Sequence, residues 1–243
     1  MNKIIVILLL LINQSTFSQT KGRVTYKSYF SESIATEELK KKNRIEYQEA
    51  LDEEMMAKML FFNLDFNKEE SLFYLSSNLI SDYENQNRKK YIIGLFYGLD
   101  EFYINRETDS LIEQQEYSFG IILKKKRASF IEWKLTNEEK QINGYKCLKA
   151  TYTYIQKWKG REFPWKVEAW YCPEIPVSLG PIRYSGLPGL ILQLHEKNCG
   201  FIVDKIEFDI DEIKIKKPNK GEVISDDEIK KRDNEVKSTL IEN

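Results

Sequence analysis

The side chains that could carry a reaction are few and widely spaced. His195 is the only histidine in 243 residues, which excludes sites built on two histidines, including the H-E-x-x-H zinc motif of metalloproteases. Ser185 lacks the upstream glycine of a G-x-S-x-G nucleophile elbow. The sequence has no glycine-rich phosphate loop and no C-x-x-C pair. It therefore indicates no cofactor and no metal.

Two weaker arrangements remain. His195 and Cys199 are four residues apart and could share a soft metal, but two ligands without a third favour an ordinary histidine in a hairpin. Asp and Glu together number 38, so a carboxylate pair could serve as general acid and base. Their spacing singles out no pair. We therefore expect no catalytic residues, and keep an envelope hydrolase that uses a carboxylate pair as the alternative.

The predicted pairing of the three cysteines depends on the register of a hairpin. We expect this hairpin over Tyr145–Cys172, with its turn at Lys159–Gly160. Placing Trp158 opposite Arg161 sets apolar against apolar residues on one face and Lys against Glu on the other. Leu148 then faces Tyr171, Ala150 faces Ala169, Tyr152 faces Val167, and Tyr154 faces Trp165.

The same register places Cys147 directly opposite Cys172, at a separation that a disulfide can bridge. Our first hypothesis is a Cys147–Cys172 disulfide with Cys199 free. A Cys172–Cys199 bridge and three unpaired thiols are the alternatives, because a single bulge would shift the pairing.

A proline- and glycine-rich connection follows this hairpin and contains Y-S-G-L-P-G-L-I-L at Tyr184–Leu192. Pro188–Gly189 suits the centre of a type II turn, and Leu187 must be extended because it precedes proline. Leu187, Leu190 and Ile191 would anchor the turn on the core. Physical reasoning alone favours a tight structural corner here.

At these residues the chain resembles the GLPGLI family of exported Gram-negative envelope proteins. The motif loop comprises Gly180, Pro181, Gly186, Leu187, Pro188, Gly189, Leu190 and Ile191. Further matching positions are Ile142–Cys147, Lys149–Ala150, Ala169–Tyr171 and Glu174–Pro176, so about residues 20 to 240 resemble one such protein. The resemblance implies an envelope role, alongside an outer-membrane transport receptor, and no reaction. Cys172 stands where we expect relatives to have a hydroxyl residue.

The N-terminus has the three parts of a secretory signal peptide. Lys3 precedes an unbroken apolar run at Ile4–Ile12, and a short polar segment with small residues follows it. We predict cleavage between Ser18 and Gln19. A nine-residue apolar run is too short to cross the roughly 30 Å hydrocarbon core of a membrane. We expect an exported protein, periplasmic or extracellular, without a transmembrane segment in its mature chain.

Composition indicates a globular protein with much β structure. The formal net charge is −1, which argues against a nucleic-acid-binding surface. Aromatic residues make up 13% of the chain and suit half-buried strands. We expect one globular domain over residues 19–243.

The elements expected to hold these residues are mostly strands. Gly22–Phe30 alternates as a first strand, and Thr36 is an N-cap for one long helix ending at Met59. That helix carries an apolar stripe at Leu39, Tyr47, Leu51, Met55 and Met59, which we expect to face the core. Phe62–Phe66 and Ser71–Leu75 should pair with Phe66 opposite Ser71, Leu64 opposite Phe73 and Phe62 opposite Leu75. Further strands are expected at Tyr91–Tyr97, Phe102–Asn105, Leu111–Leu123, Ala128–Leu135, Leu190–His195 and Phe201–Phe208.

A charged helix near residues 225–240, capped by Ser225 and Glu228, should end the domain. The expected fold is α+β: a long, curved antiparallel sheet packed against the Thr36–Met59 helix. It would resemble the half-barrel of periplasmic lipoprotein carriers. The first function hypothesis is a non-enzymatic protein that binds an apolar, lipid-like ligand or a membrane-transport partner. The carboxylate hydrolase and a purely structural role are the alternatives.

Overall fold

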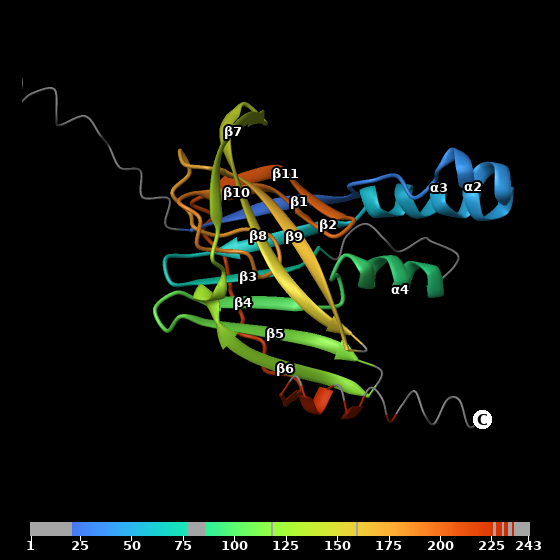
Figure 1. The fold of residues 1–243 in the computed structure, drawn as a ribbon. Coiled ribbons are helices and arrows are strands. Elements are labelled where there is room, and N and C mark those ends of the chain that lie inside the picture. The colour runs from blue at the N-terminus through green and yellow to red at the C-terminus, as the bar shows by residue number, and fades with distance from the viewer. Residues whose placement is uncertain are drawn as a thin grey trace, which may run out of the picture.

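The computed structural model describes residues 21–76, 86–117, 119–158, 160–225, 227–229, 231–232 and 235. Its centre is one sheet of twelve strands in the order β12-β6-β5-β4-β3-β2-β1-β11-β10-β9-β8-β7 (Figure 1). Every pairing is antiparallel except the short β12–β6 contact. The strands are β1 (Gly22–Phe30), β2 (Phe61–Phe66), β3 (Glu70–Leu75), β4 (Glu101–Asn105), β5 (Ser110–Tyr117), β6 (Gly120–Arg127), β7 (Lys134–Ile142), β8 (Tyr145–Trp158), β9 (Arg161–Cys172), β10 (Leu190–Glu196), β11 (Cys199–Phe208) and β12 (Glu222–Val223).

The expected α+β class is wrong, because the described chain is mainly β. The helices are α2 (Glu37–Lys42), α3 (Arg44–Lys58) and α4 (Gln86–Leu95), with a 3₁₀ turn at Ala128–Phe130. Thr36 does cap the first helix, through a 3.1 Å bond from the Leu39 amide. Asn43 then ends it in an extended conformation and caps α3 through the amides of Ile45 and Glu46. An Asn side chain competes with the helical backbone for these amides, so no long N-terminal helix forms.

The methionine stripe does not face the core as expected. Met55 is 64% exposed and Met59 53% exposed, whereas Ala50, Met56 and Ala57 are the buried residues of α3. Tyr47, Leu51 and Met55 all lie within α3, so the break at Asn43 leaves their spacing intact, but the buried face of the helix is the one that carries Ala50, Met56 and Ala57.

Both hairpin registers are confirmed. Phe66 faces Ser71 and Phe62 faces Leu75 in β2–β3, and Trp158 faces Arg161 in β8–β9 with the expected partners along the hairpin. In each case a short turn and the alternation of apolar residues specify the same pairing.

Other strand predictions need correction. Tyr91–Tyr97 lies mainly in α4 and not in a strand, and Leu111–Leu123 is divided between β5 and β6. Ala128 begins the 3₁₀ turn, and the next strand, β7, starts only at Lys134. Short apolar runs do not distinguish a strand from a buried helix by periodicity, which explains the error at α4. The predicted strands at Gly22–Phe30, Phe102–Asn105, Leu190–His195 and Phe201–Phe208 are present.

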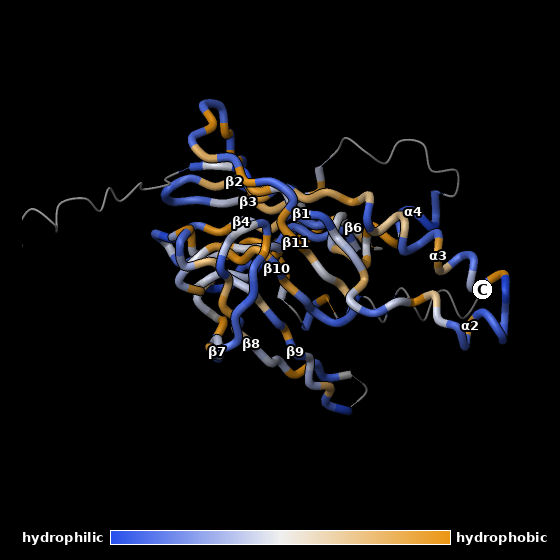
Figure 2. The backbone as a smooth tube through the Cα atoms, turned by 90° about the horizontal axis from the view of Figure 1, so that it is seen from above, coloured by the Kyte–Doolittle hydropathy of each residue, from blue (hydrophilic) through white to orange (hydrophobic). Residues whose placement is uncertain are grey.

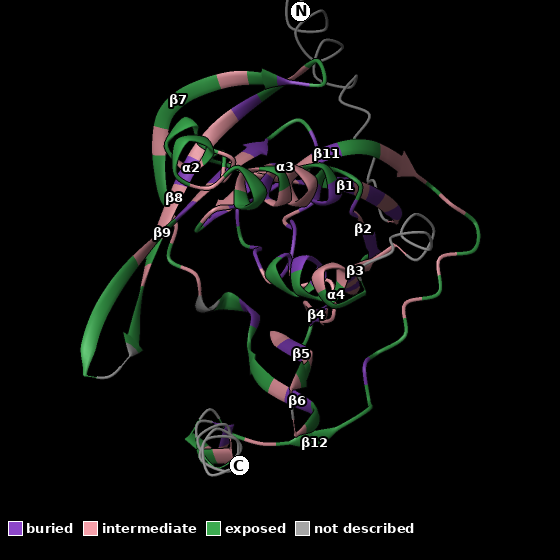
Figure 3. Cartoon of the chain, turned by 90° about the vertical axis from the view of Figure 1, so that its right-hand side faces the viewer, coloured by how far each residue is buried: buried purple, intermediate pink, exposed green. Residues whose placement is uncertain are grey.

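The strands form an arc, from β7–β9 through β11, β1 and β2 to β5 and β6 (Figure 3). Buried aromatic residues of β1–β4 and β11 pack together on the inner face, with Phe62 and Phe73 stacked at 5.4 Å between ring centroids. The β9–β10 pairing stops at Val167, and the β7–β8 pairing stops at Thr151. The end of the β8–β9 hairpin therefore extends away from the sheet (Figure 2).

The predicted signal peptide and its Ser18–Gln19 cleavage site lie outside the described residues. Most of the expected 225–240 helix does too, although 227–229, 231–232 and 235 are helical and the Glu228 amide donates to Ser225 Oγ. None of the helices in the described ranges is long and apolar enough to cross a membrane.

Candidate functional site

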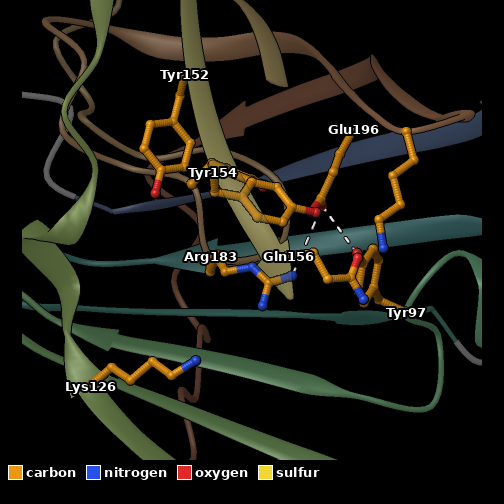
Figure 4. A pocket seen from close by; sticks show the side chains of 9 residues that line it. Tyr97, Lys126, Tyr152, Tyr154, Gln156, Arg183 and Glu196 are labelled. Carbon is orange, nitrogen blue, oxygen red and sulfur yellow. Dashed lines mark hydrogen bonds and ion pairs between the residues drawn. The ribbon is translucent and has the colours of Figure 1, made fainter. Parts of the chain in front are cut away.

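A cavity of about 310 Å³ lies between residues of β8 and β6, with further lining from the end of β10 and the segment before it. Tyrosines and charged residues from both sides line it (Figure 4). The lining residues are Tyr97, Lys126, Tyr152, Tyr154, Gln156, Arg183, Tyr184, Glu196 and Lys197. The volume is at the lower end of the range for small-molecule sites.

Glu196 is a buried carboxylate at the end of β10, only 2% exposed. The Tyr154 hydroxyl donates to its Oε1 at 2.8 Å, and the Tyr97 hydroxyl donates to its Oε2 at 3.1 Å. Burial, with the negative charge of Glu196, raises the pKa of both tyrosines above their usual range. Both hydroxyls therefore stay protonated and act as hydrogen-bond donors. Glu196 is thus held by fixed donors in a site that largely excludes water.

Arg183 joins Glu196 to a second buried carboxylate. Its Nη1 lies 3.2 Å from Oε1 of Glu113, which is 1% exposed, and its Nη2 lies 3.9 Å from Oε2 of Glu196. The guanidinium also lies over the rings of Tyr97 and Phe102, about 5.4 and 5.5 Å from their centroids. Burial opposes its charge, but the two carboxylates outweigh burial and raise the pKa of Arg183. One buried cation therefore neutralises part of the charge on two acids.

A further acid borders this cluster. Asp100 accepts a bond from Gln115 Nε2 at 3.1 Å. Burial, with a smaller contribution from the nearby Glu113, raises the pKa of Asp100 to about 6. Its carboxyl group therefore titrates close to neutral pH.

The segment between β9 and β10 places Arg183 in the cavity. Its backbone is tied by bonds from the Ile191 amide to Leu179 O (2.9 Å) and from the Leu190 amide to Ile175 O (2.9 Å). Ile182, just before Arg183, has φ +60°, a left-handed conformation that is rare for a β-branched residue. Such strain persists only where surrounding contacts enforce it. The loop therefore fixes the direction in which Arg183 leaves the backbone.

The motif loop supports this segment but does not form the predicted type II turn. The Gly189 amide donates to the Leu187 carbonyl at 2.8 Å, a tighter three-residue turn around Pro188. Leu187, Leu190 and Ile191 are buried as expected, and Gly186 and Pro188 are exposed.

Close packing explains two of the motif glycines. A Cβ on Gly180 would lie 2.6 Å from Ile191 Cβ, and a Cβ on Gly189 would clash with the Cys172 carbonyl. Pro181 is buried beside Gly180. The motif residues thus support the site from behind, and none of them lines the cavity.

The Cys147–Cys172 disulfide is also a wrong prediction. Cys147 pairs with Lys140 in β7, Cys172 pairs with Leu190 in β10, and the β8–β9 ladder ends one residue earlier, at Leu148–Tyr171. Cys147, Cys172 and Cys199 are all buried free thiols. Burial, together with the neighbouring Cys172, raises the pKa of Cys147 to about 12, so its thiol is un-ionised and a weak nucleophile.

The residues at the centre of the site were missed by the sequence reasoning. Side chains two residues apart lie on the same face of a strand. Glu196 therefore shares the core face of its strand with Leu192 and Leu194. Glu113 follows Leu111 in the same way. A charged residue on the apolar face of a strand was the available signal. Arg183 had only its position inside the family-marking segment to single it out.

His195 lies on the opposite face of β10, away from the cavity. Its ring contacts the Tyr29 hydroxyl and lies 3.0 Å from Gln193 Nε2, and Lys140 donates to the Gln193 carbonyl. Burial and nearby lysines lower the pKa of His195. Among the described residues, no group of three or more His, Cys, Asp or Glu is arranged to hold a metal ion, so His195 and Cys199 belong to no such group.

Comparisons with known proteins add a limited family match. A family described as "Protein of unknown function (Porph_ging)" matches residues 156–193, which include Gln156, Arg183, Tyr184 and the whole motif loop. No curated protein matches the chain. Two solved structures, of PNGF-II in space groups P21 and C2, align with TM-scores of 0.48 at 16% and 15% identity. Each alignment covers 87% of this chain and 32% of the other, so the chain spans about a third of the length of PNGF-II.

Proposed function

We propose that this chain is an exported envelope protein that binds a ligand in the cavity beneath the β8–β9 hairpin and catalyses no reaction there. The observation that carries the proposal is the state of Glu196. Both of its carboxylate oxygens accept bonds from tyrosine hydroxyls, and Arg183 lies beside one of them. A general acid or base must exchange a proton with its substrate, whereas this carboxylate is engaged in holding the walls of the cavity.

The same geometry argues for binding over the carboxylate hydrolase. Glu113 and Glu196 are both bound to Arg183, and of the two only Glu196 lines the cavity. Both carboxylates are engaged by the same cation, Arg183. Four tyrosines and five charged or amide side chains line the cavity, and an aromatic wall with placed polar groups is typical of a binding site.

The proposed location in the cell envelope is based on the GLPGLI resemblance and on the predicted signal peptide. The Porph_ging match, to a family of unknown function, covers the motif loop and the Arg183 segment. In this proposal the motif loop positions Arg183 and Tyr184, and the ligand contacts the side chains that the loop presents.

Native and denaturing mass spectrometry of protein exported to a periplasm tests both parts. We expect a denatured mass that reports cleavage after Ser18, and a native mass larger by one bound small molecule. Tyr152→Ala should lose that adduct, because Tyr152 lines the cavity. Tyr145→Ala, a matched change of another half-buried tyrosine in the same strand, should keep it.

An adduct kept by Tyr152→Ala would place the ligand elsewhere and contradict the proposal. Equal native and denatured masses of the unaltered protein would also contradict it. Cross-linking in the envelope would then test for a transport partner instead.

A further inference from the structure

Positive side chains outnumber negative ones around the cavity. Lys126, Arg183 and Lys197 line it, against the single carboxylate of Glu196. The oxygens of Glu196 are taken by Tyr97, Tyr154 and Arg183. The carboxylate that would balance the lysines is therefore already engaged.

Neither lysine is held by a short ion pair among the described residues, although Lys126 has a long one with Glu113. Lys126 Nζ lies 3.8 Å from Glu113 Oε2, and its side chain is 38% exposed. This separation is longer than the roughly 2.7–2.9 Å of a charge-assisted hydrogen bond. Lys197 Nζ lies 5.2 Å from the centroid of the Trp165 ring, and no carboxylate of the described residues lies within 4.0 Å of it. Since neither ammonium group makes a short charge-assisted hydrogen bond to a carboxylate of the described residues, each can approach an anion in the cavity.

The wall beside them is flat and aromatic. The rings of Tyr152 and Tyr154 lie 6.2 Å apart with 26° between their planes, and Trp133 packs edge-on against Tyr152. Trp133 is itself fixed by a 2.8 Å bond to the Ser185 carbonyl. Such faces favour flat apolar groups.

We infer that the cavity selects a small ligand that joins a flat apolar body to an anionic group. The body would lie against Tyr152 and Tyr154, and the positive charge of the two lining lysines, Lys126 and Lys197, would attract the anion. This inference rests on the proposed function and names the class of ligand for the same site. Gln156, which also lines the cavity, adds an amide donor.

Two fluorescent probes that differ in one charged group test the inference. 8-Anilinonaphthalene-1-sulfonate carries a sulfonate, and N-phenyl-1-naphthylamine has the same ring body without it. We expect the dissociation constant of the sulfonate probe to be at least about tenfold lower than that of the neutral probe. One contact between the sulfonate and a lysine near the protein surface is enough for a tenfold difference. Raising the salt concentration should weaken only the sulfonate probe.

Lys126→Gln/Lys197→Gln should remove the tenfold preference and leave the neutral probe unchanged. The control Lys146→Gln/Lys205→Gln removes the same charge from exposed lysines paired elsewhere, with Glu139 and Glu207, and should keep the preference. Tyr152→Ala should weaken both probes, which shows that they report the cavity and not another apolar surface.

The outcomes separate the two proposals. If both probes bind equally and the double lysine change alters neither, the anion selection is wrong and the aromatic binding site stands. If neither probe binds, or if both bind independently of Tyr152, the binding site itself is wrong.

Discussion

Glu196 and His195 are neighbours in β10, yet they belong to two very different polar clusters. On the inner face, Glu196 meets Arg183 and two tyrosine hydroxyls among buried rings. On the outer face, His195 meets Tyr29 and Gln193 in a network that reaches partly exposed lysines. The inner groups carry formal charges in a place that water scarcely reaches, whereas the outer groups are neutral or solvated.

The difference determines what each cluster tolerates. Removing one partner of a buried ion pair leaves an uncompensated charge, which costs much more than the pair contributes. Removing one member of a half-exposed network allows water to replace it. The inner cluster should therefore control stability, and the outer cluster should contribute little.

The largest effect is expected from Arg183→Met. The change leaves Glu113 and Glu196 buried without their shared cation, and we expect a loss of about 3–5 kcal/mol in the free energy of unfolding. Urea denaturation measures it. Adding Glu196→Gln should restore part of the loss, because one of the two stranded charges is then removed. A loss below about 1 kcal/mol, which is typical of solvent-exposed ion pairs, would show that the inner cluster contributes no more to stability than the outer one.

Gly189→Ala tests whether the inner cluster depends on the motif loop. Its Cβ would clash with the Cys172 carbonyl, and its φ is +153°. Strain and overpacking together should cost about 3 kcal/mol. Gly186→Ala is the control, because its φ is also positive, +91°, but no atom lies within 4 Å of the added Cβ; it should cost about 1–2 kcal/mol. Equal losses in thermal denaturation would show that packing behind the loop is unimportant.

A matched pair of tyrosine changes compares the two faces directly. Tyr154→Phe removes a donor to a buried carboxylate, with an expected loss of about 1.5–3 kcal/mol. Tyr29→Phe removes a hydroxyl that bonds neutral groups on the outer face, with an expected loss of about 0.5–1.5 kcal/mol. Chemical denaturation of both variants under one condition gives the difference. A larger loss for Tyr29→Phe would reverse the comparison.

The smallest expected effects concern pH, and they have opposite signs on the two faces. The folded pKa of Asp100 is about 6, above its unfolded value of about 3.9. Between these values the folded state binds more protons than the unfolded state, so stability falls as pH rises. Asp100→Asn should remove this slope and stabilise the protein at pH 7 by about 1 kcal/mol, discounted for solvent contact.

His195 should give the reverse slope. Its folded pKa lies below the unfolded value of about 6.5. In the window just below pH 6.5 the unfolded state binds more protons, so stability rises with pH and is lost as pH falls. His195→Gln should remove that rise. Subtracting the stability curve of each variant between pH 4 and 8 from that of the unaltered protein isolates the two contributions, and contributions with the same sign of slope would contradict the assignment.

Local signals predicted much of the sheet. The two hairpin registers follow from short turns and apolar alternation, and both are correct. Errors came where a local signal competes with another. Asn43 divides the expected helix because its side chain caps a new one, and the apolar run at Tyr91–Tyr97 folds mainly as helix α4 although its composition favours a strand.

The sequence by itself determined the pairing of neighbouring strands, the position of the motif loop and the absence of histidine-based catalytic motifs, because each depends on residues close along the chain. Only the tertiary structure decided the candidate site. Tyr97, Glu113, Arg183 and Glu196 come from four separate segments, and they meet because the sheet curves until β10 and the motif segment face β4 and β5. The register alone did not decide the state of the cysteines, because Cys147 and Cys172 are free thiols although the β8–β9 ladder reaches Leu148 and Tyr171, the residues next to them. Curvature is the sum of small twists and bulges over many strands, and no single stretch of sequence specifies it.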